Sequence, residues 1–201
     1  DIDVINTGAA DPGKLEVKLD GESVRATVQS FADAGRGSNV IVVLDNSKAM
    51  GNGAVQLAKR ALEQLAPGTG GINATGVVTV GGGARLVVPL TRSATTLQSL
   101  SKPIAPGGST ALWDGIVLAA NTLGSKQGAN NHQIVVLSGT SDEVSRAKYA
   151  NVEAALRSSG SLLHVSALPA GSPDVDTLQS HVAEAGGSYQ VGTSNDVSTM
   201  F

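Results

Sequence analysis

The chain has 201 residues, a length that suits one domain with a small addition and allows a substantial buried core. A net charge of −3, an aromatic content of 2% and the lack of a basic stripe argue against nucleic-acid binding. The absence of cysteine excludes disulfides and thiolate metal sites. No apolar run approaches the length of a membrane-spanning helix.

The first segment with a clear pattern is a predicted β-hairpin between residues 15 and 30. Apolar and polar residues alternate from Leu15 to Val28 on both sides of an Asp20-Gly21 turn. Two strands alone are marginally stable in water, so we expect the hairpin to pack on the rest of the chain. The predicted organisation is therefore an N-terminal extension at 1–38, with its hairpin packed on a main domain at 39–201.

From Val40 onward the pattern changes to alternating strands and helices. The predicted strands are 40–44, 74–80, 85–90, 133–137, 162–168 and 189–191, and the predicted helices are 54–65, 93–100, 112–123, 152–160, 174–185 and 195–201. The two strands flanking Gly81-Gly82-Gly83 are expected to form a hairpin at one edge of the sheet. The order predicts an α/β fold, doubly wound, with a mostly parallel central sheet and helices on both faces.

Three loops with small or polar residues are expected to meet at one edge of this sheet. Asp45 and Ser47 follow the strand 40–44, Thr110 precedes the helix 112–123, and Gly139 follows the strand 133–137. Because parallel strands of such folds end at the same edge, this edge is where a ligand is expected to bind.

These three segments resemble motifs of the von Willebrand factor type A (VWA) family. Residues 45–50 resemble its Asp-x-Ser-x-Ser metal motif, and residues 106–116 resemble its Gly-Gly-x-Thr-x-Leu segment. Residues 135–142 stand where the family has Leu-Thr-Asp-Gly. The resemblance implies a Rossmann-like fold from about residue 39 and a site for Mg²⁺ or Ca²⁺. Ala49 replaces the second serine of the first motif, and Gly139 replaces the aspartate of the third.

The metal ligands that the resemblance implies are Asp45, Ser47 and Thr110, with Asp142 as a candidate substitute for the missing aspartate. Mg²⁺ requires near-octahedral oxygen coordination, whereas a single carboxylate remains here and Lys48 beside it repels a dication. One interpretation is a vestigial site that binds Mg²⁺ or Ca²⁺ weakly and is completed by a partner's carboxylate. The alternative, which we favour, is a hydrogen-bond network in which Asp45 accepts from Ser47, Thr110 and backbone N–H groups.

The resemblance implies a non-enzymatic module that binds another protein in adhesion or assembly. Its binding surface would be the loops 46–53, 105–113 and 139–149, here called the upper face. The candidate contact residues are Lys48, Trp113, Asp142 and Glu143. Trp113 has a second interpretation as a core residue, because it stands in the first turn of a predicted helix.

Two rival functions remain open at this point. A hydrolase or nucleotide-binding protein on a similar sheet would need a catalytic base or a phosphate loop at the upper face. None of the histidines (His132, His164, His181) falls in a loop there, and neither Gly-x-Ser-x-Gly nor a full Gly-x-Gly-x-x-Gly is present. The other rival is a scaffold that pairs an edge strand with its partner and leaves the upper face idle.

Composition and chain ends suggest where the protein works. Abundant Ala, Gly, Val and Ser with little Lys suggests a bacterial protein from a GC-rich genome. The first residue is Asp, and the predicted helix 195–201 supplies only about two turns, so we expect this to be part of a larger protein. It resembles extracytoplasmic VWA domains tethered to bacterial secretion or pilus-assembly membrane proteins. The expected location is the cell surface or periplasm, with any tether outside this chain.

Overall fold

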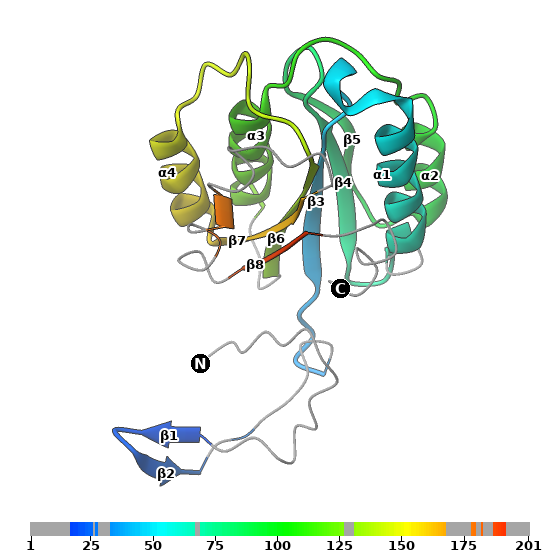
Figure 1. Ribbon diagram of the computed structural model, residues 1–201. Helices are drawn as coiled ribbons and strands as arrows, with labels where there is room; N and C mark the ends of the chain where they lie inside the picture. The colour runs from blue at the N-terminus through cyan, green and yellow to red at the C-terminus, as the bar shows by residue number, and fades with distance from the viewer. Residues whose placement is uncertain are drawn as a thin grey trace.

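A six-stranded sheet forms the centre of the molecule, as the computed structural model shows (Figure 1). The structure describes residues 17–25, 27, 33–66, 69–126, 131–167, 178–179, 182 and 187–191. The strands are β1 (Val17–Leu19), β2 (Glu22–Val24), β3 (Ser38–Leu44), β4 (Ala74–Thr79), β5 (Arg85–Thr91), β6 (Asn131–Ser138), β7 (Ser161–Ala167) and β8 (Ser188–Val191). The helices are η2 (Lys48–Met50), α1 (Gly51–Leu65), α2 (Ala94–Ser101), α3 (Leu112–Gly124) and α4 (Tyr149–Ser159).

The sheet has the strand order β5-β4-β3-β6-β7-β8. All neighbouring pairs are parallel except β4 and β5, which form the expected antiparallel hairpin at one edge. This confirms the predicted α/β class with a mostly parallel sheet.

The two central strands, β3 and β6, are buried on both faces. Val43 and Leu44 of β3 pair with Val136 and Leu137 of β6, and all four side chains are at most 1% exposed. Continuous apolar runs of this kind are typical of parallel strands covered by helices on both sides. The parallel register also brings the carboxyl ends of β3 and β6 to the same edge, where Asp45 follows Leu44.

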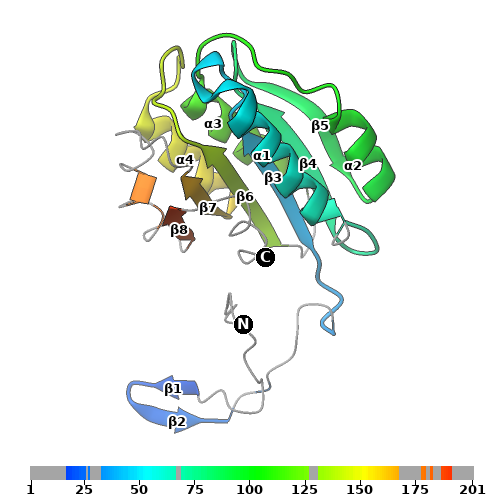
Figure 2. The same ribbon diagram turned by 45° about the vertical axis from the view of Figure 1, so that its right-hand side comes forward.

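Helices cover the sheet on both faces, as Figures 1 and 2 show. One apolar cluster joins α3 and α4 to residues such as Ile41, Val43 and Val165. The other joins α1 and α2 to residues such as Val42 and Leu44. Successive residues of β3 therefore serve opposite layers, as the twofold alternation of a strand requires. Within the described residues, no helix is long and apolar enough to cross a membrane.

The predicted elements match the observed ones within a few residues at their ends. The strand predicted at 133–137 is longer, because β6 begins at Asn131 and ends at Ser138. Of the helix predicted at 174–185, only residues 178–179 and 182 are described; they are helical, and Leu178 and Val182 are buried in the α3–α4 layer. The helix predicted at 195–201 lies outside the described residues.

The N-terminal hairpin is present as β1 and β2, paired antiparallel around Asp20 and Gly21. Both turn residues have positive φ, at 51° and 86°, as a two-residue type I′ turn requires. Leu19 and Val24 are 66% and 40% exposed, and Figures 1 and 2 draw the hairpin apart from the α/β body. Packing of the hairpin on the body stays a prediction, which limited proteolysis of the first thirty or so residues would test.

His164, on β7, is expected to make stability depend on pH. Its side chain is 4% exposed, its Nδ1 lies 2.9 Å from Ser188 Oγ, and its buried Nε2 has no partner among the described residues. Burial lowers the pKa of His164 below its usual value. The unfolded chain, with a histidine pKa of about 6.5, therefore binds the proton more readily. The stability that neutral His164 contributes to the folded protein is fully present above about pH 6.5 and is lost as the pH falls below it. The free energy of unfolding then falls by at most about 1.4 kcal/mol per pH unit.

Thermal unfolding of the protein and of His164→Gln at pH 7.5 and pH 5.0 measures this dependence. We expect a smaller fall in Tm on acidification for the variant, because glutamine cannot take up a proton. Equal falls in both proteins would show that His164 does not control this pH dependence.

Candidate functional site

The candidate site lies where β3 and β6 end. The Asp45 backbone N–H donates to the Leu137 carbonyl oxygen at 2.9 Å, which continues the β3–β6 ladder by one rung. This bond fixes the Asp45 backbone, and the side chain is 0% exposed. A buried carboxylate requires hydrogen bonds to replace those it would make with water.

The Asp45 carboxylate receives three hydrogen bonds. Its Oδ1 accepts from the Ser47 backbone N–H at 2.9 Å. Its Oδ2 accepts from the hydroxyl groups of Ser138 at 2.7 Å and Thr140 at 2.5 Å. Since an ionised carboxylate has about four acceptor positions, three of them are already used. Among the described residues, no salt bridge joins Asp45 to Lys48.

Thr110 joins the network through Thr140, not through Asp45 directly. The two threonine hydroxyls lie 2.8 Å apart, and both side chains are buried. The expected convergence of Asp45 and Thr110 is thus observed, but the expected direct bond from Thr110 to Asp45 is wrong. The reason is that the loop after β6 places Thr140 between them.

Ser47 differs from its expected role in a similar way. Its backbone N–H, not its hydroxyl, bonds to Asp45. The Ser47 Oγ is buried and has no hydrogen-bond partner among the residues that the structure describes. A buried polar atom of this kind calls for an explanation such as an ordered water or an ion.

Asn46 ties three loops together behind Asp45. Its side-chain Nδ2 donates to the Ala105 carbonyl at 2.8 Å, and its Oδ1 accepts from the Gly81 N–H at 2.8 Å. Its backbone carbonyl accepts from the Gly107 N–H, also at 2.8 Å. One residue therefore links the end of β3 to the β4–β5 turn and to the loop before α3.

Close backbone contact between glycines holds the same two loops together. Gly108 has φ 57°, and a Cβ added there would lie 2.5 Å from the Gly82 nitrogen and overlap the Gly82 Cα. The Gly82 N–H donates to the Ser109 carbonyl at 2.8 Å, and the Lys48 N–H donates to the Gly108 carbonyl at 3.0 Å. Only residues without side chains allow this approach.

The third loop of the upper face is bonded to the start of α3. Asp142 Oδ1 accepts from the Trp113 N–H at 3.3 Å and from the Ser145 hydroxyl at 2.6 Å. The Asp114 carboxylate accepts from the backbone N–H groups of Arg146 and Ala147. Asp142 is therefore engaged at the first turn of α3, where a carboxylate satisfies free helix N–H groups.

The four candidate contact residues fall into two groups. Trp113 and Asp142 are half-buried, and the Trp113 ring meets Tyr149 edge to face with centroids 5.7 Å apart. Lys48 and Glu143 are exposed, and so is Val144, with 51% of its side chain accessible. The surface available for contact thus centres on Lys48, Glu143 and Val144, while Trp113 packs against the α3–α4 layer.

The donor chemistry of this site does not fit a resident divalent ion. The orphaned Ser47 hydroxyl offers one neutral oxygen, but Asp45 is the one carboxylate in the network and most of its acceptor positions are filled. Within the described residues, no group of three or more His, Cys, Asp or Glu side chains could hold a metal. Mg²⁺ and Ca²⁺ need six or more oxygen ligands, and a water is enough to satisfy Ser47.

Sequence reasoning missed Ser138, Thr140 and Asn46. The signal for the first two was a hydroxyl residue on either side of Gly139, because residues two apart in an extended segment point to the same side. The family motif predicts an aspartate at position 139, so the prediction concerned its absence and not the two flanking hydroxyl residues. Asn46 carried no comparable signal, since its partners are backbone groups of loops distant in the sequence.

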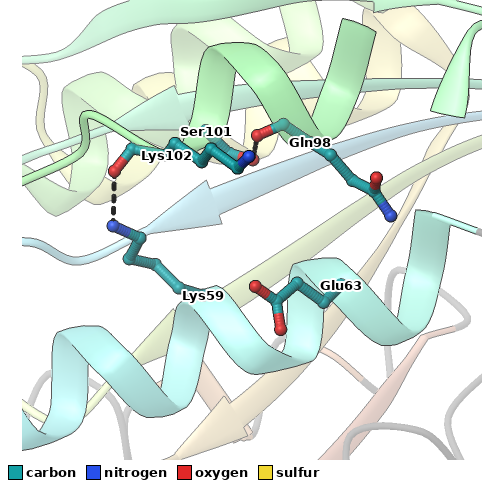
Figure 3. A pocket seen from close by; sticks show the side chains of 5 residues that line it. All are labelled: Lys59, Glu63, Gln98, Ser101 and Lys102. Carbon is teal, nitrogen blue, oxygen red and sulfur yellow. Dashed lines mark hydrogen bonds between the residues drawn. The ribbon is translucent and has the colours of Figure 1, made fainter. Parts of the chain in front are cut away.

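A separate pocket of about 270 Å³ lies between α1 and α2 (Figure 3). It is lined by Lys59, Glu63, Gln98, Ser101 and Lys102. Lys59 Nζ donates to the carbonyl oxygens of Lys102 at 2.6 Å and Ile104 at 3.2 Å, which satisfies carbonyls left free where α2 ends. The Lys59 ammonium group thus has structural partners, and none of the residues that line the pocket belongs to the site at Asp45.

The fold and site define an α/β domain whose loops gather around a buried aspartate at the carboxyl edge of the sheet. The model of the von Willebrand factor type A domain family matches residues 40–141, slightly more than half of the chain. The chain therefore belongs to this family. No curated protein matches the sequence.

Solved structures of low sequence identity share the fold. An aerotolerance-related membrane protein from Bacteroides fragilis is 23% identical, with a TM-score of 0.65, and the match covers 81% of this chain and 95% of that one. BatB from Bacteroides thetaiotaomicron is 18% identical, with a TM-score of 0.64 and coverage of 81% and 94%. A von Willebrand factor type A protein from Catenulispora acidiphila is 16% identical, with a TM-score of 0.68, and covers 81% of this chain and 40% of that one.

Proposed function

We propose that this chain is a non-enzymatic module that binds another protein through its upper face. The observation that carries the proposal is the contrast between a buried network and an exposed rim. Asp45, the residue best placed to act as a base, is 0% exposed and already hydrogen-bonded, while Lys48, Glu143 and Val144 project from fixed backbone above it. Such an arrangement offers contact surface, and the described carboxylate at the sheet edge is already engaged in hydrogen bonds.

The rival interpretations have less support. Of the histidines with described positions, His132 is the second residue of β6 and His164 is the fourth residue of β7, so neither lies at the carboxyl edge. An edge-strand scaffold would use β5, but Pro89 in β5 lacks an N–H donor. Proline in an edge strand obstructs pairing with a further strand, so β5 is poorly suited to recruit a partner.

The proposed setting is outside the bacterial cytoplasm, in adhesion or assembly at a membrane. The similar fold of the Bacteroides fragilis aerotolerance-related membrane protein supports this setting, as does the family's general use in protein contacts. Binding of Mg²⁺ or Ca²⁺ is proposed to be weak at most, because one hydrogen-bonded carboxylate cannot offset the cost of removing water from the ion.

Site-specific photo-cross-linking tests the proposed contact surface. A photoreactive residue would replace Val144 on the upper face or Leu100 on α2, two apolar side chains of similar exposure at 51% and 41%. In the source cells, we expect position 144 to yield a discrete cross-linked protein and position 100 to yield none. Cross-links from position 100 alone, or from a probe on β5 alone, would contradict the proposal.

A further inference from the structure

The hydrogen bonds around Asp45 have a defined direction. An ionised carboxylate only accepts, so the hydroxyl hydrogens of Ser138 and Thr140 both point to Asp45 Oδ2. Thr140 has then used its single hydroxyl hydrogen, and Thr110 must be the donor of the bond between the two threonines. The Ser138 hydroxyl, in turn, accepts from the Thr140 backbone N–H at 3.3 Å. We call these four residues, Asp45, Thr110, Ser138 and Thr140, the hydroxyl relay.

We infer that the hydroxyl relay performs the joining role of a metal ion, so that Ser138 and Thr140 hold the upper face together without divalent cations. The relay connects the end of β3, the end of β6 and the loop before α3, which are separated by up to 95 residues. The same three segments supply the partners that an ion at this edge would bridge. Ser138 and Thr140 are thus positioning residues, since they act through Asp45 and Thr110.

An ion bound directly to Asp45 Oδ2 would have to displace the hydroxyl relay, because both of its hydroxyl donors occupy that oxygen. Direct coordination by Asp45 Oδ2 would require the Ser138 and Thr140 hydroxyls to turn their hydrogens away from a buried carboxylate. The other acceptor of the Ser138 hydroxyl is the Thr140 carbonyl at 3.4 Å, a longer contact, and that of the Thr140 hydroxyl is the uncharged Thr110 hydroxyl at 2.8 Å. The hydrogen bonds lost are charge-assisted and therefore among the stronger ones. The site has a single buried carboxylate to attract a dication. Its attraction is therefore weak compared with the hydrogen bonds that the ion would replace.

The relay also explains how exposed contact residues are held. The Thr110 carbonyl accepts from the backbone N–H groups of Glu143 at 2.8 Å and Val144 at 3.0 Å. The position of Thr110 therefore determines where these two side chains stand on the upper face. We expect this arrangement to be the same with and without Mg²⁺ or Ca²⁺. Only the consequence for a partner rests on the proposed function; the relay itself does not.

The test combines a metal titration with a matched pair of variants. Thr140→Val removes the central hydroxyl of the relay at nearly constant volume. Thr75→Val is the control, because the Thr75 hydroxyl is also buried and also bonded to a threonine, Thr69, at 2.7 Å, but in β4 near the opposite end of the sheet. Thr140→Ser keeps the hydroxyl and serves as the rescue variant.

For the unmodified protein we expect the same Tm in EDTA and in about 10 mM Mg²⁺ or Ca²⁺, whereas an ion at a hundredfold excess over its Kd would raise Tm by several degrees. Amide hydrogen exchange at Glu143 and Val144 should also be unchanged by EDTA. In Thr140→Val we expect these two amides to exchange at least about tenfold faster, with little change in Thr75→Val and recovery in Thr140→Ser.

Two results would overturn the inference. One is a rise in Tm of several degrees with millimolar Mg²⁺ or Ca²⁺ in the unmodified protein, which would show an ion joining the loops. The other is equal exchange at Glu143 and Val144 in Thr140→Val and Thr75→Val, which would leave the relay without a positioning role. Neither result bears on photo-cross-linking at position 144, so failure of the relay and failure of the proposed function can be distinguished.

Discussion

Asp45→Ala is expected to lower the free energy of unfolding by about 3 kcal/mol, the larger end of single-substitution effects. Alanine removes the acceptor of three buried hydrogen bonds, from the Ser47 N–H and from the hydroxyls of Ser138 and Thr140. It leaves these donors buried without an equivalent partner. For a chain of this length, the loss corresponds to a fall in Tm of about 10 °C, measurable by calorimetry.

Asp45→Asn is the matched control for this substitution. Its amide oxygen can still accept from the Ser47 N–H, and its volume is almost unchanged. Its NH₂ group replaces the Oδ2 acceptor, so we expect an intermediate loss of about 1 to 2 kcal/mol. A gain in stability for Asp45→Ala would contradict the account, because it would mean that burying the charge costs more than its hydrogen bonds return.

Gly108→Ala is expected to destabilise the protein by about 3 kcal/mol and to separate two loops of the upper face. The residue has φ 57°, and its new Cβ would overlap the Gly82 Cα. Backbone on both sides leaves no flexible side chain to move aside. The substitution should therefore also weaken the bonds from Gly82 N–H to Ser109 and from Lys48 N–H to Gly108.

Substitutions at two nearby glycines distinguish the steric overlap of the new Cβ from the backbone strain of a positive φ. Gly107→Ala meets nothing within 4 Å and has no positive φ, so we expect a change within about 0.5 kcal/mol. Gly83→Ala has φ 118° but open space around its Cβ, and it measures the backbone strain alone. Chemical denaturation of the three variants would refute the close-contact explanation if Gly108→Ala and Gly107→Ala were equally stable.

These variants bear on whether the upper face is a switch or a fixed surface. In a site held by an ion, loop positions depend on cation concentration. In this chain, the Asn46 bonds and the glycine contacts join the β4–β5 turn to the loop before α3 without an ion. The hydroxyl relay likewise joins the ends of β3 and β6 to the loop before α3. The face is therefore expected to be ready for a partner at any cation concentration, which suits a constitutive contact more than a regulated one.

The order and type of the described elements could be predicted because periodicity carries that information. The run of apolar residues from Val40 to Leu44 is too short for a helix and fully apolar, which identified a buried parallel strand. Glycines marked the turn between β4 and β5 and the end of α4, where Gly160 has φ 60°. Strand ends were less accurate, since β6 extends two residues further toward its start than its apolar pattern does.

The location of the candidate site and the proximity of its residues were predicted, but the hydrogen-bond partners within it were not. That Asp45 and Thr110 would meet followed from strand order, because parallel strands deliver their ends to one edge. That Thr140 would stand between them did not follow, because it depends on the backbone course after Ser138. Trp113 shows the same limit: its two interpretations were open in the sequence, and the edge-to-face contact with Tyr149 depends on how α3 packs beside α4.

The sequence by itself determined the class of fold and the place of the site at the sheet edge, and it has Gly139 where the family motif has an aspartate. These features depend on local patterns of side chains along the chain. Only the tertiary structure decided which groups satisfy Asp45, because hydrogen bonds between residues up to 95 positions apart act over less than 3 Å and depend on loop positions that no local pattern specifies. A buried charge must find partners, and folding selected the nearest hydroxyls, those of Ser138 and Thr140.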